Sequence, residues 1–206
     1  MELFLTSSVH AVAHDIAKKV DLSKKDKLVF ITTPPEPEKG DKEWLRNDRQ
    51  ALVDAGFIVQ DYTITNKTKE EIKKDLIEFD YIYLSGGNTG YLLEESQKSG
   101  FVFLIREFIR NEGKIYIGTS AGSIIAGPKL PKYYPEEDRE LEDRECYNLV
   151  NFTIMPHWGS EHFRDKYLDK RLEVAYNDNE VPFLLLTDNQ YVHVQNGKME
   201  IIDVEK

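Results

Sequence analysis

The chain has 206 residues, a length that suits one domain with a substantial buried core. Its formal net charge of −10 argues against a nucleic-acid partner, because binding phosphates requires a basic face. The single cysteine, Cys146, excludes an internal disulfide and suits a reducing cytoplasm. No apolar run approaches the ~18 residues of a membrane span, and the N-terminus lacks a signal-peptide pattern. We therefore expect one cytoplasmic domain, residues 1–206, that binds neither nucleic acid nor membrane.

The first half of the chain alternates short apolar runs with helical patterns. Strands are predicted at residues 2–6, 28–32, 57–59, 81–84 and 114–117. Helices are predicted at residues 9–20, 41–55, 68–79 and 101–110. The run at 28–32 is apolar throughout, which is typical of a strand buried on both faces of a parallel sheet. The order predicts an α/β fold with an open, mostly parallel sheet and helices on both faces.

A glycine-rich turn at residues 85–90, Ser-Gly-Gly-Asn-Thr-Gly, follows the predicted strand at 81–84. Backbone N–H groups in a turn of this kind can hold an anion. The turn has neither the Lys-Ser/Thr pair of a P-loop nor the Gly-x-Gly-x-x-Gly of a dinucleotide fold. We therefore do not expect a nucleotide cofactor.

A Gly-x-Ser-x-Gly cluster, with Ser120 between Gly118 and Gly122, joins the strand at 114–117 to an apolar, small-residue segment. Glycines at these positions let the strand and the following helix approach closely, which is the pattern of a nucleophile elbow. The start of the helix can also favour a developing anion beside the serine. The same cluster occurs in ordinary strand-to-helix connections, so a catalytic role for Ser120 depends on its partners.

The second half of the chain begins with a long polar stretch and then resumes the alternation. The stretch at 127–146 is rich in acidic residues and is either a lid beside a site or a solvated surface. Further elements are a strand at 152–156, a helix at 160–176, a strand at 181–186 and hairpin strands at 191–194 and 199–202. Asn196-Gly197 between the last two predicts a C-terminal hairpin.

Two polar residues follow the late strands and are candidates to activate Ser120. Ligands of open α/β sheets bind at the carboxyl ends of the strands, and His157 comes directly after the strand at 152–156. An imidazole can accept the proton of a serine hydroxyl at neutral pH. Asp188, after the strand at 181–186, can orient the imidazole, although it can also be an ordinary turn aspartate.

Other residues compete with Asp188 or complete the site. The acidic residues at 136–138 are alternative acceptors for His157. The backbone N–H groups of Ala121 and Gly87 are expected to form an oxyanion hole.

Three motifs together resemble those of the peptidase E and cyanophycinase family of serine peptidases. They are Ser-Gly-Gly-Asn-Thr at 85–89, Tyr-Ile-Gly-Thr-Ser-Ala-Gly at 116–122 and Met-Pro-His at 155–157. The resemblance extends from the first strand to the final hairpin. It implies a flavodoxin-like fold related to class I glutamine amidotransferases. It also implies Ser120 as nucleophile and His157 as base, with Asp188 in the place where peptidase E has glutamate.

The resemblance also implies an arginine that reads an aspartyl side chain, beyond the histidine. Arg164 and Arg171 both lie in that region, and neither matches the family pattern cleanly. Arg164 is nearer the start of the expected helix, so we expect Arg164 and Asn88 to bind substrate. The alternative is that both arginines are solvated surface residues.

The sequence therefore predicts a serine peptidase-like hydrolase that cleaves a small peptide, such as an Asp-X dipeptide, through an acyl-enzyme. We expect no metal and no cofactor, and a monomer or homodimer. Alternatives are an esterase or amidase with the same triad, or a binding protein on the same fold that has lost turnover. A glutamine amidotransferase is disfavoured because its nucleophile is a cysteine, and Cys146 lies in the wrong element.

Overall fold

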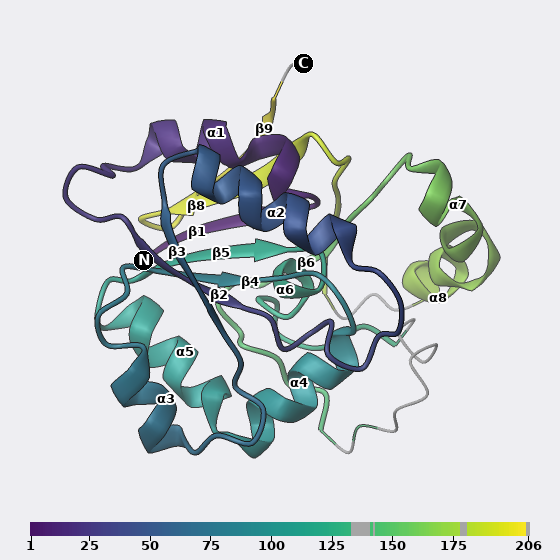
Figure 1. Cartoon of the computed structure of the whole chain (residues 1–206). Coiled ribbons are helices and arrows are strands. Elements are labelled where there is room, and N and C mark those ends of the chain that lie inside the picture. Colours follow the sequence, from purple (N-terminus) through teal and green to yellow (C-terminus); the bar gives the residue numbers. More distant parts are fainter. Residues whose placement is uncertain (133–140, 142, 178–180, 205–206) are drawn as a thin grey trace.

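The computed structural model describes residues 1–132, 141, 143–177 and 181–204 (Figure 1). Within this part of the chain, seven strands form one sheet in the order β3-β2-β4-β5-β1-β8-β9. Their bounds are β1 (Glu2–Thr6), β2 (Lys27–Ile31), β3 (Ile58–Tyr62), β4 (Tyr81–Leu84), β5 (Ile115–Thr119), β8 (Gln190–Gln195) and β9 (Lys198–Asp203). The strands from β3 to β1 are parallel, and β8 and β9 add an antiparallel hairpin. The predicted fold class is confirmed.

Helices cover both faces of the sheet (Figure 1). They are α1 (Val9–Lys19), α2 (Glu43–Asp54), α3 (Lys69–Asp75), α4 (Thr89–Lys98), α5 (Phe101–Arg110) and α6 (Ala121–Ile124). A capping box starts α3, since the Thr68 hydroxyl accepts from the Glu71 N–H and the Glu71 carboxylate accepts from the Thr68 N–H. None of the helices in the described ranges combines the length and apolar character that a membrane crossing requires.

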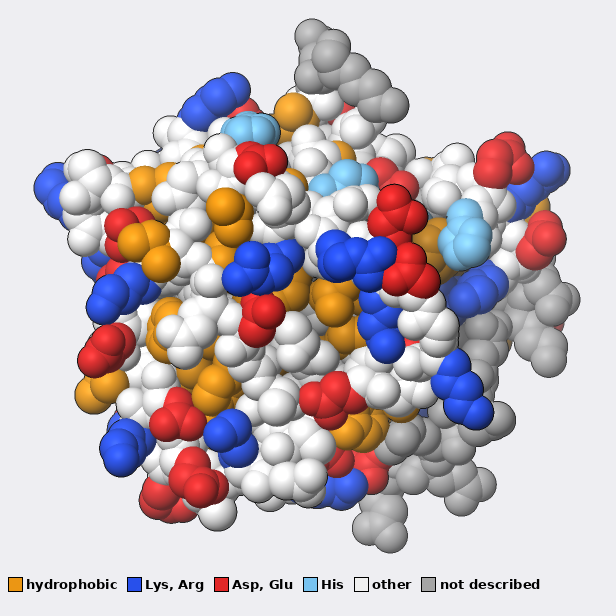
Figure 2. All heavy atoms as spheres, viewed as in Figure 1, with side chains coloured by type: hydrophobic (Ala, Val, Ile, Leu, Met, Phe, Trp, Pro, Cys, Tyr) orange, Lys and Arg blue, Asp and Glu red, His pale blue; other side chains and the backbone are white. Residues whose placement is uncertain are grey.

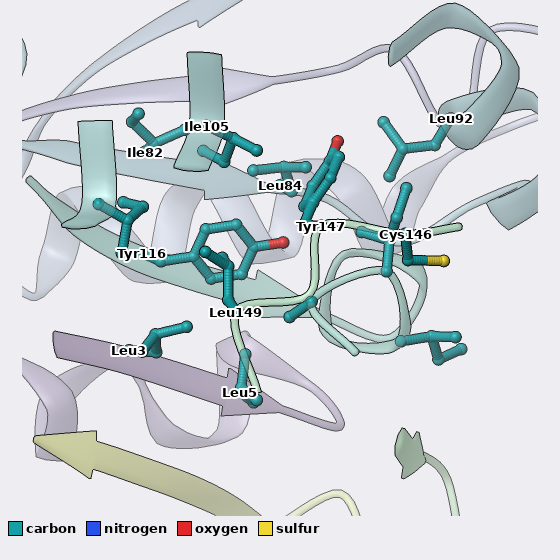
Figure 3. Packing of buried hydrophobic residues seen from close by; sticks show 14 of the residues in the cluster. Leu3, Leu5, Ile82, Leu84, Leu92, Ile105, Tyr116, Cys146, Tyr147 and Leu149 are labelled. Atoms are coloured by element: carbon teal, nitrogen blue, oxygen red, sulfur yellow. The ribbon is translucent and has the colours of Figure 1, made fainter. Parts of the chain in front are cut away.

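Two hydrophobic cores lie on opposite faces of the sheet, because successive side chains of a strand point to opposite faces. Phe4 of β1 packs in the core under α1 and α2, whereas Leu3 and Leu5 pack in the core under α4 and α5. Figure 3 shows the second core, in which Tyr147 lies beside Tyr116. Cys146, Tyr147, Leu149 and Val150 are part of this core, although they follow the long polar stretch. On the face drawn in Figure 2, basic and acidic side chains are intermingled.

The late strands differ in their pairing from the rest of the sheet. The predicted strands at 152–156 and 181–186 are present as β6 (Thr153–Met155) and β7 (Phe183–Leu185), which form a separate two-stranded parallel sheet. The physical reason is that β5 and β1 each already have a strand on both sides, β8 being the outer neighbour of β1.

The segment after β6 is helical, as predicted, but it is not one regular α-helix. It consists of a 3₁₀ turn (Glu161–Phe163), α7 (Arg164–Lys166), a π-helical turn (Tyr167–Arg171) and α8 (Leu172–Asn177). Figure 1 shows this helical arm standing beyond the ends of the strands.

Helix α6 approaches the sheet very closely. A Cβ atom added to Gly122 would lie 2.2 Å from the carbonyl oxygen of Leu84 in β4, and one added to Gly118 would lie 2.6 Å from the Gly122 oxygen. Neither glycine can carry a side chain without moving backbone. This contact places the first turn of α6 directly on the carboxyl ends of β4 and β5.

We therefore expect Gly122→Ala to lower the free energy of unfolding by about 1–3 kcal/mol or more, because overpacking against backbone cannot relax. Urea denaturation of purified protein measures this loss. Thr68→Ala, which removes only a helix cap and costs about 1 kcal/mol, is the comparison variant. A loss for Gly122→Ala no larger than that for Thr68→Ala would contradict the close-approach argument.

Candidate active site

Ser120 lies at the junction of β5 and α6 in a conformation that few serines adopt. Its backbone φ is +49° and ψ −107°, and its N–H donates to the carbonyl oxygen of Thr6 at 3.1 Å. A positive φ is strained for a residue with a side chain, and such strain clusters at functional sites. The elbow therefore holds the Ser120 hydroxyl above the end of the sheet.

His157 follows β6 and faces Ser120. Its Nε2 lies 3.0 Å from the Ser120 Oγ, and its ring is stacked on Phe163 with a centroid distance of 4.2 Å. Its φ is +60°, a second strained position in the same site. The stacking and the backbone conformation together fix the direction of the imidazole.

Asp188 lies on the other side of the imidazole, with its Oδ1 2.7 Å from the His157 Nδ1. A carboxylate can only accept, so Nδ1 carries the hydrogen and Nε2 is left to accept from Ser120. The hydrogen bond from His157 lowers the pKa of Asp188 below its ordinary value; burial opposes this shift, and a hydrogen bond from Ser7 adds to it. Asp188 is thus held in its charged form.

Ser7 is a member of this cluster that the sequence reasoning missed. Its Oγ donates to the Asp188 Oδ1 at 2.7 Å and accepts from the His157 backbone N–H at 2.7 Å. It follows β1, which lies next to β5 in the sheet. Ser7 comes directly after a strand, at the same edge of the sheet as Ser120. This position in the sequence is the signal that identifies Ser7 as a site residue.

The glycine-rich turn lies beside Ser120, as expected. A Cβ atom on Gly86 would be 3.5 Å from the Ser120 Cβ, and Gly87 has a φ of +125° with no room for a side chain against Pro34. Ala121 is the first residue of α6, so its N–H lies in the first turn and has no intrahelical acceptor. The backbone at Gly87 and Ala121 therefore flanks the serine.

Of the two residues expected to bind substrate, Asn88 lies in the glycine-rich turn beside Ser120, and Arg164 lies on the helical arm after His157. The Asn88 carboxamide oxygen accepts from the Tyr91 N–H at 2.6 Å and caps α4. The Arg164 side chain is 63% exposed, pairs with Glu161 at 3.8 Å and does not line the pocket. Arg171 does line it and is only 6% exposed, with its guanidinium carbon 5.4 Å from the Tyr167 ring centroid. Of the two arginines considered, Arg171 therefore lies at the pocket and Arg164 on the surface.

A pocket of about 580 Å³ opens over the cluster and is wide enough for a small peptide. Its walls come from the first two turns of α1 and α2 with the loop before α2, the glycine-rich turn, the elbow, the helical arm after His157, and the loop that carries Asp188. The alternative acceptors at 136–138, and residues 133–140 and 142 of the polar stretch at 127–146, lie outside the described residues. In the described ranges no group of three or more His, Cys, Asp or Glu side chains is arranged to hold a metal ion.

Comparisons with known proteins identify relatives of this chain. The chain matches the model of peptidase family S51 over residues 3–202. It is 31% identical over 167 residues to an uncharacterized peptidase from Listeria monocytogenes, covering 79% of this chain and 80% of that one. It is 29% identical over 212 residues to a Drosophila melanogaster protein named probable alpha-aspartyl dipeptidase, covering 95% and 83% of the two chains.

A solved structure shows the same arrangement of the chain. The crystal structure of a peptidase E-type protein from Listeria monocytogenes superposes with a TM-score of 0.86 at 26% identity, covering 99% of this chain and 98% of that one. The resemblance to the peptidase E family, drawn from three short motifs, is confirmed. The chain belongs to peptidase family S51 and is a peptidase.

Proposed function

We propose that the protein is a serine dipeptidase that hydrolyses Asp-X dipeptides through an acyl-enzyme. The observation that carries the proposal is the hydrogen-bonded chain from Ser120 through His157 to Asp188, at 3.0 and 2.7 Å. A serine, an imidazole and a carboxylate in this order form a proton-transfer system on several unrelated folds.

The first half of the reaction forms the acyl-enzyme. The Ser120 Oγ attacks the scissile carbonyl carbon while its proton passes to the His157 Nε2. The carbonyl oxygen becomes an oxyanion, which the backbone N–H groups of Gly87 and Ala121 stabilise. The C–N bond then breaks, and the leaving amine takes the proton from His157.

The second half releases the acyl group. A water molecule gives a proton to the His157 Nε2 and attacks the ester carbon. The C–O bond to Ser120 then breaks, and the proton returns to its Oγ. Asp188 remains charged throughout and stabilises the imidazolium that forms twice in each cycle.

The position of Arg171 supports a substrate with an acidic residue before the cleaved bond. A guanidinium matches a carboxylate with two parallel hydrogen bonds, and its charge acts more strongly where water is excluded. Arg171 is buried and lines the pocket that contains Ser120. The name of the Drosophila relative supports the same specificity.

Ser120→Ala should abolish hydrolysis, because the hydroxyl supplies the nucleophile. Loss of the nucleophile removes about 10⁶ in kcat in a well-studied serine protease. Turnover of an Asp-X panel and labelling by a fluorophosphonate measure the effect, with exposed Ser23 replaced by alanine as control. An unlabelled wild type, or substantial turnover by the alanine variant, would contradict the proposal.

Asp188→Asn should lower kcat by about 10⁴, the loss seen when the aspartate of a comparable triad is replaced by asparagine. The physical reason is that an amide does not stabilise the imidazolium and permits the wrong tautomer. Steady-state kinetics measure the change, and Asp54→Asn on the exposed face of α2 is the control. A kcat within about tenfold of wild type would mean that another residue is the third member of the triad.

Arg171→Met should lower kcat/KM for Asp-Ala by about 10- to 100-fold and leave Leu-Ala nearly unchanged, since only the first substrate presents a carboxylate. Arg164→Met is the matched control and should affect both substrates little. Paired measurements on the two dipeptides test this. Equal losses on both substrates, or a larger effect from Arg164, would contradict the assignment of Arg171.

A further inference from the structure

A second histidine–carboxylate pair lines the same pocket, on the wall formed by α1 and α2. The His10 Nδ1 lies 3.1 Å from the Asp48 Oδ1, and the Tyr83 hydroxyl donates to the Asp48 Oδ2 at 2.9 Å. Asp48 is 2% exposed, whereas the His10 side chain is 49% exposed. The pair therefore has a buried, hydrogen-bonded carboxylate behind an imidazole that faces the pocket.

This pair is not a second nucleophile system. The Ser8 Oγ lies 2.9 Å from the His10 Nδ1, the same ring nitrogen that contacts Asp48. A relay needs the serine and the carboxylate on opposite nitrogens of the imidazole. Both polar contacts are on one side, so Nε2 is the nitrogen left to meet a ligand.

The surroundings of His10 favour its charged form. The hydrogen bond to Asp48 raises the pKa of His10 above its ordinary value of 6.5; burial opposes the shift, and the charges of Asp48 and Asp188 add to it. A protonated His10 presents an Nε2–H donor with a positive charge. Its natural ligand is a carboxylate, because a charge-assisted hydrogen bond to an anion is the strongest contact that it can make.

The pocket thus has two anchored cations on separate walls. Arg171 comes from the helical arm after His157, and His10 comes from α1 on the sheet. An Asp-X dipeptide has two carboxylates, one on its first side chain and one at its C-terminus, and the scissile amide lies between them. Lys166 and His162 also line the pocket, but among the described residues neither has a carboxylate partner that holds it in place, as Asp48 holds His10.

We propose that His10, held by Asp48, is a specificity-determining residue that binds the C-terminal carboxylate of the dipeptide. This inference rests on the proposed function and extends it. Recognition of a terminal carboxylate confines cleavage to the last peptide bond of a substrate, so it selects dipeptides over longer chains and over amides. Asp48 is a positioning residue that acts through His10.

The test compares Asp-Ala with Asp-alaninamide, which differ only in the terminal carboxylate. His10→Gln keeps a hydrogen-bond donor near Asp48 but cannot carry a charge. It should lower kcat/KM for Asp-Ala by about 10- to 100-fold, mainly through KM, and change Asp-alaninamide by less than about threefold. His14→Gln, an exposed histidine on the same helix, is the matched control and should change neither.

A pH series separates binding by His10 from a structural role. The groups facing His10 are Ser8, Asp48 from α2 with Tyr83 behind it, and Asp188 from the loop after β7. The ratio of kcat/KM for the acid to that for the amide cancels every pH effect on catalysis that the two substrates share. In wild type the ratio should fall as pH rises through the raised pKa of His10, because deprotonation removes the positive charge that attracts the carboxylate. In His10→Gln the ratio should be flat.

Two kinetic results would overturn the inference. Equal losses on the acid and the amide, or no loss on either, would mean that His10 does not read the carboxylate. If Lys166→Met instead lowers kcat/KM for the acid and not for the amide, then Lys166 on the helical arm binds the terminal carboxylate, and the inference is wrong.

Failure of the proposed function has a different signature. If wild type cleaves neither peptide, binding of both to Ser120→Ala is measured by calorimetry, with and without His10→Gln. A preference for the acid that His10→Gln removes supports the inference, whereas equal binding of acid and amide, or no binding, overturns it.

Discussion

The site depends on the contact between two glycines and the end of the sheet. Gly122 lies so close to the Leu84 carbonyl oxygen that a Cβ on it would be 2.2 Å away. A Cβ on Gly118 would likewise clash with the carbonyl oxygen of Gly122. Only with this approach does α6 start directly at the carboxyl end of β5. Ser120 then occupies the junction with a φ of +49°, and its hydroxyl is raised toward the imidazole. Removing the close approach would move the nucleophile as well as the helix.

Ser7 links the parts of the site that come from different regions of the chain. Its hydroxyl contacts both the His157 backbone and the Asp188 carboxylate, and it follows β1, the strand beside β5. His157 and Asp188 follow β6 and β7, which form a separate two-stranded sheet. A hydroxyl at the edge of the main sheet therefore fixes their position relative to Ser120.

The sequence by itself determined the order of the strands and helices, the elbow and the identity of Ser120, His157 and Asp188 as a candidate set. These features are either local in the sequence or follow from the way parallel strands end at one edge of a sheet. Apolar runs and turn residues identify strands and their ends, and the Gly-x-Ser-x-Gly cluster at 118–122 specifies a sharp turn. Because strand ends of an α/β sheet meet at one edge, polar residues at such ends are expected to come together.

Only the tertiary structure decided which side chains line the pocket. Arg164 was expected because a regular helix would bring it nearest the strand end, but a 3₁₀ turn and a π-helical turn change the number of residues per turn and direct Arg171 inward instead. The pairing of His10 with Asp48 joins two helices, α1 and α2, that are separated by a strand in the sequence. Such contacts depend on how helices pack across the sheet, and no local pattern along the chain encodes that.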